Sequence, residues 1–270
     1  MIRLSATAPI ALMLLVAGCN GVSGQESREA PTSSATKAAS SSSSPETDEG
    51  ELTLASGATV FYRCVGQGAP AFLLEAGGVG TEEFDSPFVD PLAKVHKVCT
   101  YDRLGLGSSD PAPDRKRTVD DLCDVEDQVR QRLGLESPAV LAGQSAGANQ
   151  VIWCAARRPG AVASLVSIEG YHDDPAELAA EFGKGSWRGS PEHIDWAQGA
   201  AMLEKMRKPI GKFPVLVISA SDADPGGVKN QRYWLALSPR SRQVVLNGGH
   251  NLHFEVPDQV TAEMLATWPD

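Results

Sequence analysis

Apolar residues recur along the chain in short runs, and polar or glycine-rich segments separate these runs from about residue 59 onward. Val, Ile, Leu and aromatic side chains dominate them. Such runs, bounded by Gly, Pro, Asp and Ser, are typical of strands that are buried on both faces of a sheet. We therefore predict strands at residues 59–65, 71–76, 95–102, 138–143, 162–170, 213–221 and 242–249.

Helix signals lie between these strands, and the clearest follows residue 117. Thr118 can cap a helix, acidic residues fill its first turn, arginines fill its last turn, and Gly134 ends it. Further helices are predicted at residues 145–159, 228–237 and 257–268. Apolar strands alternating with helices favour an α/β fold with a mostly parallel sheet covered by helices on both faces.

The first fifty residues have a different character. The apolar run at residues 10–16 is too short to span a bilayer and has the size of a signal-peptide core. It continues into "LVAGC", which resembles the lipobox of bacterial lipoproteins and makes Cys19 the expected lipidation site; the alternative is an ordinary signal peptide with an incidental cysteine. The Ser-rich residues that follow contain almost nothing large and apolar, so they cannot offset the entropy of ordering. We expect a signal peptide at 1–18, an acylated Cys19 with a disordered linker at 19–50, and one folded domain at 51–270.

Charge and cysteine content narrow the functional classes. The net charge is −10 and no basic cluster lies along any predicted helix, so we expect no nucleic-acid partner. An even number of further cysteines in an exported chain suggests disulfides, although free buried thiols remain the alternative. Their spacings match no zinc pattern, and we expect no metal. These cysteines are Cys64, Cys99, Cys123 and Cys154.

The main candidate for chemistry is Ser145 in "LAGQSAG", which has the pattern G-x-S-x-G. The pattern alone is weak, but here an apolar strand runs directly into it and a helix follows directly, as a nucleophile turn requires. The tight turn leaves no room for bulk two residues before or after the serine, and glycines stand at both places. The N–H of Ala146, at the start of the helix, can point at a developing oxyanion.

A serine nucleophile needs a base, and five histidines are available. His250 follows the last predicted strand in "LNGGHNLHFEVP", so it lies on a loop at the end of the sheet that carries Ser145. The two glycines before it let the loop bend. His253 is the alternative base. The remaining histidines, which precede a strand or lie in the irregular region, are poorer candidates.

Several motifs in order together resemble the α/β-hydrolase superfamily, in particular the serine hydrolases and esterases. They are "LLEAGG", "CTYDRLGLGSSDP", "LAGQSAG" and "NGGHNLHFEVPDQV". The resemblance covers about residues 52–268. It implies an eight-stranded sheet with a small cap between strands six and seven, at residues 171–212. It also implies that the N–H of Gly78 is the second oxyanion donor, while Asp102 and Arg103 are interpreted as structural.

The resemblance bears on the cysteines as well. Strands two and four are neighbours in that fold, which implies a disulfide between Cys64 and Cys99. The helices that carry Cys123 and Cys154 share a face of the sheet, which implies the second pair.

The acid that would orient the histidine has three candidates. Asp222 and Asp224 lie in the loop after strand seven, the common position in the superfamily, but neither has the usual offset. Glu169 lies at the tip of strand six, another position that the superfamily uses. A carboxylate at the end of an apolar strand is costly without a partner, which favours Glu169.

Together these features predict an extracytoplasmic, lipid-anchored serine hydrolase that cleaves carboxylic esters of small molecules or lipids through an acyl-enzyme. It would need no cofactor and act as a monomer. The alternatives are a non-catalytic, lipid-anchored binding module on a hydrolase scaffold, an amidase or peptidase, and a cofactor-free perhydrolase. Three aromatic residues could line an acyl pocket or form the core of the cap: Phe182, Trp187 and Trp196.

Overall fold

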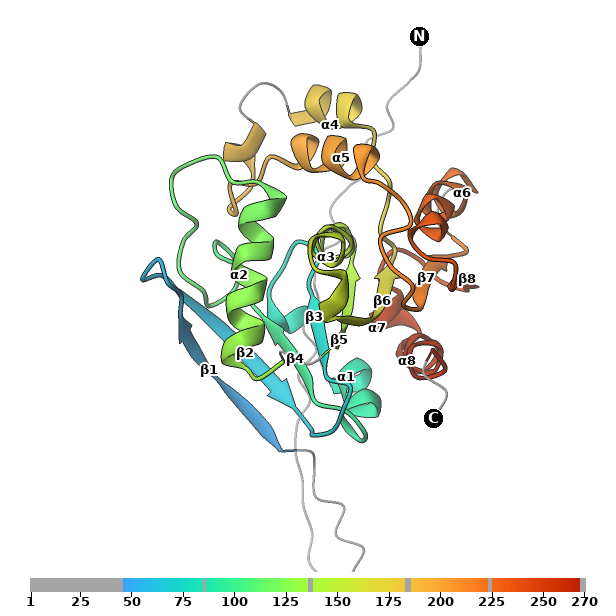
Figure 1. Ribbon diagram of the computed structural model, residues 1–270, viewed down its shortest axis with the longest axis horizontal. Helices are drawn as coiled ribbons and strands as arrows, with labels where there is room; N and C mark the ends of the chain where they lie inside the picture. Colours follow the sequence, from blue (N-terminus) through green and yellow to red (C-terminus); the bar gives the residue numbers. More distant parts are fainter. Residues whose placement is uncertain (1–45, 85, 136–137, 183–185, 223–224, 268–270) are drawn as a thin grey trace, which may run out of the picture. The chain divides into compact units, whose positions relative to one another are not determined.

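The computed structural model describes residues 46–270, apart from 85, 136–137, 183–185, 223–224 and 268–270 (Figure 1). The expected signal peptide, Cys19 and nearly all of the expected linker therefore lie outside the described residues. In the part of the chain that is described, no helix is both long and apolar enough to cross a membrane.

Within the described residues, eight strands form one sheet in the order β1-β2-β4-β3-β5-β6-β7-β8. The β1–β2 and β2–β4 pairs are antiparallel and the other pairs are parallel, which confirms the predicted sheet. The strands are β1 (Thr47–Thr53), β2 (Thr59–Val65), β3 (Phe72–Glu75), β4 (Val98–Tyr101), β5 (Ala139–Gln144), β6 (Val162–Ile168), β7 (Val215–Ala220) and β8 (Ser241–Leu246).

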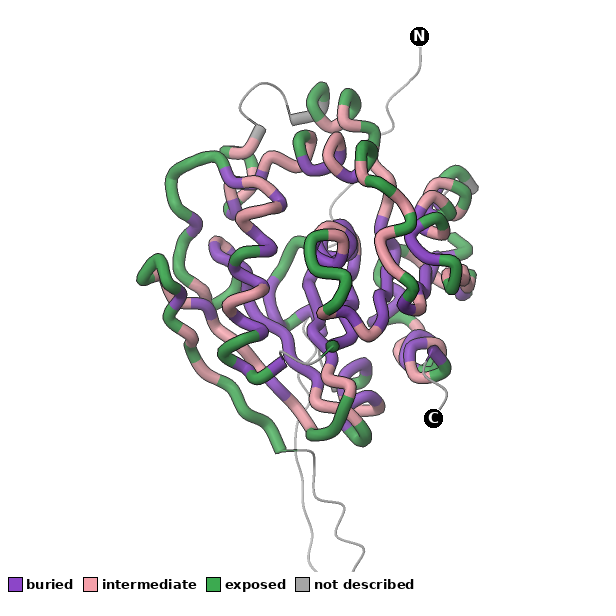
Figure 2. The backbone as a smooth tube through the Cα atoms, in the orientation of Figure 1, coloured by how far each residue is buried: buried purple, intermediate pink, exposed green. Residues whose placement is uncertain are grey.

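Helices cover both faces of the sheet, as predicted. The α-helices are α1 (Ser86–Ala93), α2 (Val119–Arg132), α3 (Ala146–Arg157), α4 (Pro175–Phe182), α5 (Trp196–Lys205), α6 (Pro225–Gln231), α7 (Leu252–Glu255) and α8 (Pro257–Leu265). Successive side chains of a strand point to opposite faces. Leu73 of β3 therefore joins the core under α2 and α3, whereas Phe72 and Leu74 join the core under α1 and α8. Figure 2 shows the inner strands buried between these layers.

The expected cap between strands six and seven is present. It contains α4, the 3₁₀ helix η3 (Ser186–Gly189) and α5, and it connects β6 to β7. Figure 1 shows α4 and α5 side by side at one end of the sheet. Leu203 of α5 is buried in the core on the α2–α3 side, so packing holds this part of the cap against the domain.

The start of the sheet and one helix differ from the sequence prediction by more than a shift of a few residues at their ends. The sheet starts at Thr47, so the expected linker is wrong for residues 47–50, which pair with β2. Their polar side chains suit an edge strand that is largely exposed. The expected helix at 228–237 is instead the end of α6 followed by the 3₁₀ helix η4 (Arg232–Leu237). This tighter path carries Trp234 into the core, where its Nε1 donates to the carbonyl of Gly170 at 2.8 Å.

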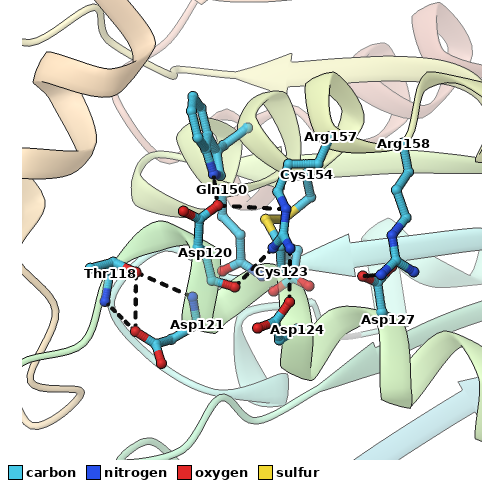
Figure 3. Close-up of a disulfide and its surroundings, with 12 residues drawn as sticks. Thr118, Asp120, Asp121, Cys123, Asp124, Asp127, Gln150, Cys154, Arg157 and Arg158 are labelled. Atoms are coloured by element: carbon cyan, nitrogen blue, oxygen red, sulfur yellow. Dashed lines mark hydrogen bonds and ion pairs between the residues drawn. A yellow bond between two sulfur atoms is a disulfide. The ribbon is translucent and has the colours of Figure 1, made fainter.

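Both predicted disulfides are confirmed. Cys64 and Cys99 are directly opposed in the β2–β4 pair, and their sulfur atoms are bonded at 2.04 Å. Cys123 of α2 is bonded to Cys154 of α3 at 1.96 Å (Figure 3). The predicted cap of α2 is present as well: the Thr118 side chain accepts from the backbone of Asp121, whose own side chain accepts from the backbone of Thr118.

Arginines at the C-terminal end of α3 and directly after it face acidic residues of α2 around the second disulfide, as Figure 3 shows. Arg157 lies 2.9 Å from Asp124, and Arg158 lies 2.6 Å from Asp127. These pairs are partly exposed, so each contributes little to stability beside the disulfide itself.

Candidate active site

Ser145 occupies the turn between β5 and α3, where the sequence predicted it. Its backbone has φ 53° and ψ −119°, a strained conformation for a residue with a side chain. A Cβ on Gly143 would lie 2.3 Å from the backbone of Gly147, and a Cβ on Gly147 would lie 2.1 Å from the carbonyl oxygen of Glu75. The two glycines are therefore required by close backbone approaches on both sides of the serine.

The structure brings His250 and Glu169 together. Glu169 follows the last residue of β6 and is fully buried, whereas the His250 side chain is 47% exposed. The Nδ1 atom of His250 lies 3.3 Å from Oε2 of Glu169. The carbonyl of His250 accepts from Nε2 of Gln144, the residue directly before Ser145, at 3.1 Å. The loop that carries His250 is thus tied to the turn that carries Ser145.

Glu169 is surrounded by hydrogen-bond donors. Its Oε1 accepts from the backbone N–H of Ala220 at 2.6 Å and from Nε2 of Gln231 at 2.9 Å, and its Oε2 accepts from the hydroxyl of Tyr171 at 3.2 Å. Burial opposes ionisation, but the bonds from His250, Gln231, Ala220 and Tyr171 outweigh it and hold the pKa of Glu169 below its usual value. The carboxylate is therefore charged at neutral pH.

The structure shows no contact between His250 and Asp222, and it does not describe Asp224, the third candidate acid. Asp222 is exposed and accepts from the hydroxyl of Ser221 at 2.9 Å, while its N–H donates to the carbonyl of Gly248. Of the acids that can be compared in the structure, Glu169 is the one that contacts the His250 ring.

His253, the alternative base, is buried on the α1–α8 side of the sheet. Its ring contacts those of Phe84 and Phe88, and neither ring nitrogen has a hydrogen-bond partner among the described residues. Burial and the nearby His250 lower its pKa to about 4, so it is neutral at physiological pH. Its environment is that of a packed core residue.

The two expected oxyanion donors belong to the residue after Ser145 and to the loop after β3. Ala146 is the first residue of α3, where backbone N–H groups have no partner within the helix. Gly78 lies in the loop after β3 (residues 76–80), which we call the oxyanion loop. It is exposed, and a Cβ there would meet nothing within 4 Å. Its neighbour Gly77 is crowded: a Cβ on Gly77 would lie 3.2 Å from Cβ of Ser145.

Glu83 is a buried acid at this site that sequence reasoning missed. Its Oε2 accepts from the N–H of Gly77 at 2.8 Å, and its Oε1 lies 3.8 Å from Nε2 of His253. Burial raises its pKa to about 7, against the lowering effect of the Gly77 hydrogen bond and of the Arg103 and His250 charges. The only sequence signal is the acidic pair Glu82 and Glu83 that follows a glycine-rich stretch.

A cavity of about 250 Å³ opens beside Ser145 and Ala146. Apolar residues of α2 and the cap form much of its wall, and Tyr171, Asn149 and Asp173 add polar groups. Trp196, one of the three aromatic candidates, lines it. Trp187 instead packs against the His193 ring and under Arg188, and the side chain of Phe182 lies outside the described residues.

Across the described residues, no cluster of His, Cys, Asp and Glu could hold a metal ion.

Residues 70–188 match the sequence profile of the α/β-hydrolase fold. An uncharacterized protein of Bacillus subtilis, YqjL, is 22% identical over 216 residues, covering 75% of this chain and 85% of that protein. The enol-lactonase of Burkholderia xenovorans superposes with a TM-score of 0.65 at 18% identity, covering 81% of this chain and 99% of its own. A thermophilic esterase of Thermogutta terrifontis superposes with a TM-score of 0.63 at 16% identity, covering 81% and 97%.

Proposed function

We propose that this chain, which has the α/β-hydrolase fold, is a serine hydrolase that cleaves carboxylic esters through a Ser145–His250–Glu169 triad. The observation that carries the proposal is the 3.3 Å contact between the His250 ring and an ionised, fully buried Glu169. The loop that carries His250 is in turn tied to the Ser145 turn through Gln144. A buried carboxylate on a partly exposed histidine is the arrangement that activates a serine hydroxyl.

The chemistry follows from these positions. With Nδ1 of His250 facing Glu169, Nε2 is the ring nitrogen that takes the proton from the Ser145 hydroxyl as its oxygen attacks the ester carbonyl. Glu169 stabilises the imidazolium. The N–H groups of Ala146 and Gly78 bind the tetrahedral oxyanion. His250 then protonates the departing alcohol, and water, activated by the same histidine, releases the acid from the acyl-enzyme.

The choice of acid rests on solvation. Glu169 is fully buried and accepts three hydrogen bonds besides its contact with His250, so its charge is fixed in place. Asp222 is exposed, and water would screen its effect on the ring. Replacing Glu169 by Gln tests this assignment: hydrolysis should fall by orders of magnitude in a protein that remains folded. Full activity there, with loss in Asp222→Asn or Asp224→Asn, would move the acid to the loop after β7.

An ester is the substrate class that the cavity and the neighbours favour. The cavity of about 250 Å³ is lined largely by apolar side chains of α2 and the cap, which suits the acyl part of a small molecule or lipid. The named neighbours are an enol-lactonase and an esterase. An amidase, a peptidase and a cofactor-free perhydrolase would use the same triad, and the ratio of ester to amide or peroxide-dependent turnover separates them.

Anchoring by a lipid on Cys19, and hence an extracytoplasmic place on a bacterial membrane, is part of the proposal and rests on the "LVAGC" sequence. Metabolic labelling of the full chain with a fatty-acid analogue tests it. Incorporation of the label into the full chain, and its loss in Cys19→Ala, would support the anchor. Unlabelled protein released from the cells would refute it. The expected monomeric state is tested by measuring the mass of the purified domain by sedimentation.

The function is tested by hydrolysis of a nitrophenyl ester series of increasing acyl length. Ser145→Ala should abolish turnover, and the exposed Ser56→Ala is the matched control that should retain it. Saturable binding of esters by folded protein without turnover would instead support the non-catalytic binding module.

A further inference from the structure

A buried arginine holds one side of the oxyanion loop. The Arg103 side chain is 1% exposed and comes from the turn after β4. Its Nη1 donates to the carbonyl of Ala76, and its Nη2 donates to the carbonyl of Gly77 at 2.6 Å. Burial disfavours the charged guanidinium, but the carboxylates of Glu192 and Glu75 outweigh this and raise the pKa of Arg103. The group is therefore a permanent cation with two of its donors on the loop.

The cap holds the same guanidinium from the other side. Nε and Nη2 of Arg103 donate to the two carboxylate oxygens of Glu192 at 2.6 and 3.1 Å. Glu192 is buried and lies between η3 and α5, and its carbonyl accepts from Nη1 of Arg117 at 3.0 Å. A Cβ on Gly105 would lie 2.2 Å from the carbonyl oxygen of Pro191. This cap segment is thus packed directly on the turn that carries Arg103.

The geometry of one peptide group connects this arginine to the proposed chemistry. The carbonyl of Gly77 and the N–H of Gly78 belong to the same planar peptide group and, in the trans form, point in opposite directions. A carbonyl fixed on Arg103 therefore fixes the direction of the Gly78 N–H. The preceding N–H, that of Gly77, donates to Glu83, and a Cβ added to Gly77 would lie only 3.2 Å from Cβ of Ser145. The peptide that bears the oxyanion donor is thus held at its carbonyl by Arg103, and the peptide before it is held at both its carbonyl and its N–H.

We propose that Arg103 is a positioning residue for the oxyanion hole: it orients the Gly77–Gly78 peptide so that the Gly78 N–H faces the oxyanion, and Glu192 makes this orientation depend on the cap. The role rests on the proposed hydrolase function. It predicts an effect on transition-state binding that exceeds the effect on substrate binding, because the oxyanion exists only after the serine has attacked.

The test compares two buried arginines. Lysine keeps the charge but loses the fork that lets Arg103 reach two carbonyls and a carboxylate at once. Arg130→Lys is the matched control, because Arg130 is 5% exposed and donates to the carbonyl of Ala161 at 2.8 Å, away from the oxyanion loop. For each variant one measures kcat and KM with an ester, the inhibition constant of a trifluoromethyl ketone that forms a tetrahedral adduct, and thermal unfolding.

We expect Arg103→Lys to lower kcat by about 10- to 100-fold, below the roughly 100- to 1,000-fold loss of a whole oxyanion donor, with KM changed less than about threefold. Ketone affinity should fall by a similar factor to kcat/KM. Glu192→Gln, which leaves the arginine in place, should give a smaller loss of the same kind. Arg130→Lys should keep kcat within about twofold even if it lowers stability equally.

Two results would overturn the role while leaving the hydrolase intact. In the first, the wild type is active and a folded Arg103→Lys variant keeps its kcat and its affinity for the ketone. In the second, Arg130→Lys loses kcat and ketone affinity as well, and the losses in both variants follow their losses of thermal stability. A wild type with no serine-dependent turnover would refute the hydrolase itself, and the role with it. If Arg103→Lys does not fold, Glu192→Gln decides alone: unchanged kcat and ketone affinity refute the role.

Discussion

Glu83 makes the stability of this protein depend on pH in a predictable direction. Its side chain is 4% exposed beneath the oxyanion loop, and its folded-state pKa is about 7 against an ordinary 4.5. The folded state therefore keeps a proton between pH 4.5 and 7 that the unfolded chain releases. Stability from this group is fully present below about pH 4.5 and is lost as the pH rises to 7.

The size of the effect follows from the difference between the two pKa values. Each pKa unit corresponds to about 1.4 kcal/mol, so the difference of roughly 2.5 units amounts to about 3 kcal/mol in the free energy of unfolding. Glu83→Gln keeps an acceptor for the Gly77 N–H but cannot ionise. Relative to wild type, the variant should therefore gain about 3 kcal/mol between pH 4.5 and pH 8.

Chemical denaturation of both proteins at intervals from pH 4.5 to pH 8 measures this difference directly. Titrating groups that do not contact Glu83, such as Glu126, are common to both proteins and largely cancel. Glu82→Gln makes the same charge change at the exposed neighbouring position and is the control, with an expected change below about 0.5 kcal/mol. A difference between Glu83→Gln and wild type that stays constant across this range would refute the assignment.

Three further predictions follow from the site and its supports. Glu169→Gln should lower kcat roughly 10³- to 10⁴-fold with little change in folding, measured by ester hydrolysis and circular dichroism; undiminished kcat would remove Glu169 from the triad. Gly147→Ala should lower the free energy of unfolding by more than about 2 kcal/mol, whereas the control Gly160→Ala, where an added Cβ meets nothing within 4 Å, should not. Equal effects of the two substitutions in denaturation would contradict the close backbone approach at Gly147. Replacing both Cys123 and Cys154 by Ala should cost at most about 4 kcal/mol, given the sequence separation of 31; an unchanged denaturation midpoint would show that the bond adds no stability.

Local patterns were enough to predict much of the fold. The apolar runs gave the sheet from β2 to β8, and the cap of α2 was predicted from Thr118 and the acids after it. The strand–turn–helix at Ser145 could be predicted because its glycines answer a local steric demand. The edge strand β1 was not predicted, and the start of the domain was expected four residues too late, because the polar residues of this strand resemble a linker until β2 pairs with them.

Contacts between residues distant in sequence could not be predicted from such patterns. Arg103 and Glu192 are 89 residues apart, and nothing near either residue indicates that they meet. The same holds for the Gln231 bond to Glu169, across 62 residues. Glu83 had no signal beyond its charge, since its raised pKa comes from burial that only the packed fold produces.

The central claim, an activated Ser145, is tested most directly by a probe that needs no knowledge of the substrate. The purified domain is incubated with a fluorophosphonate and examined by intact mass and peptide mapping. The triad predicts one adduct, on Ser145, that is absent in Ser145→Ala and strongly slowed in His250→Ala. A folded protein that gains no adduct, or one that reacts equally without His250, would contradict the account.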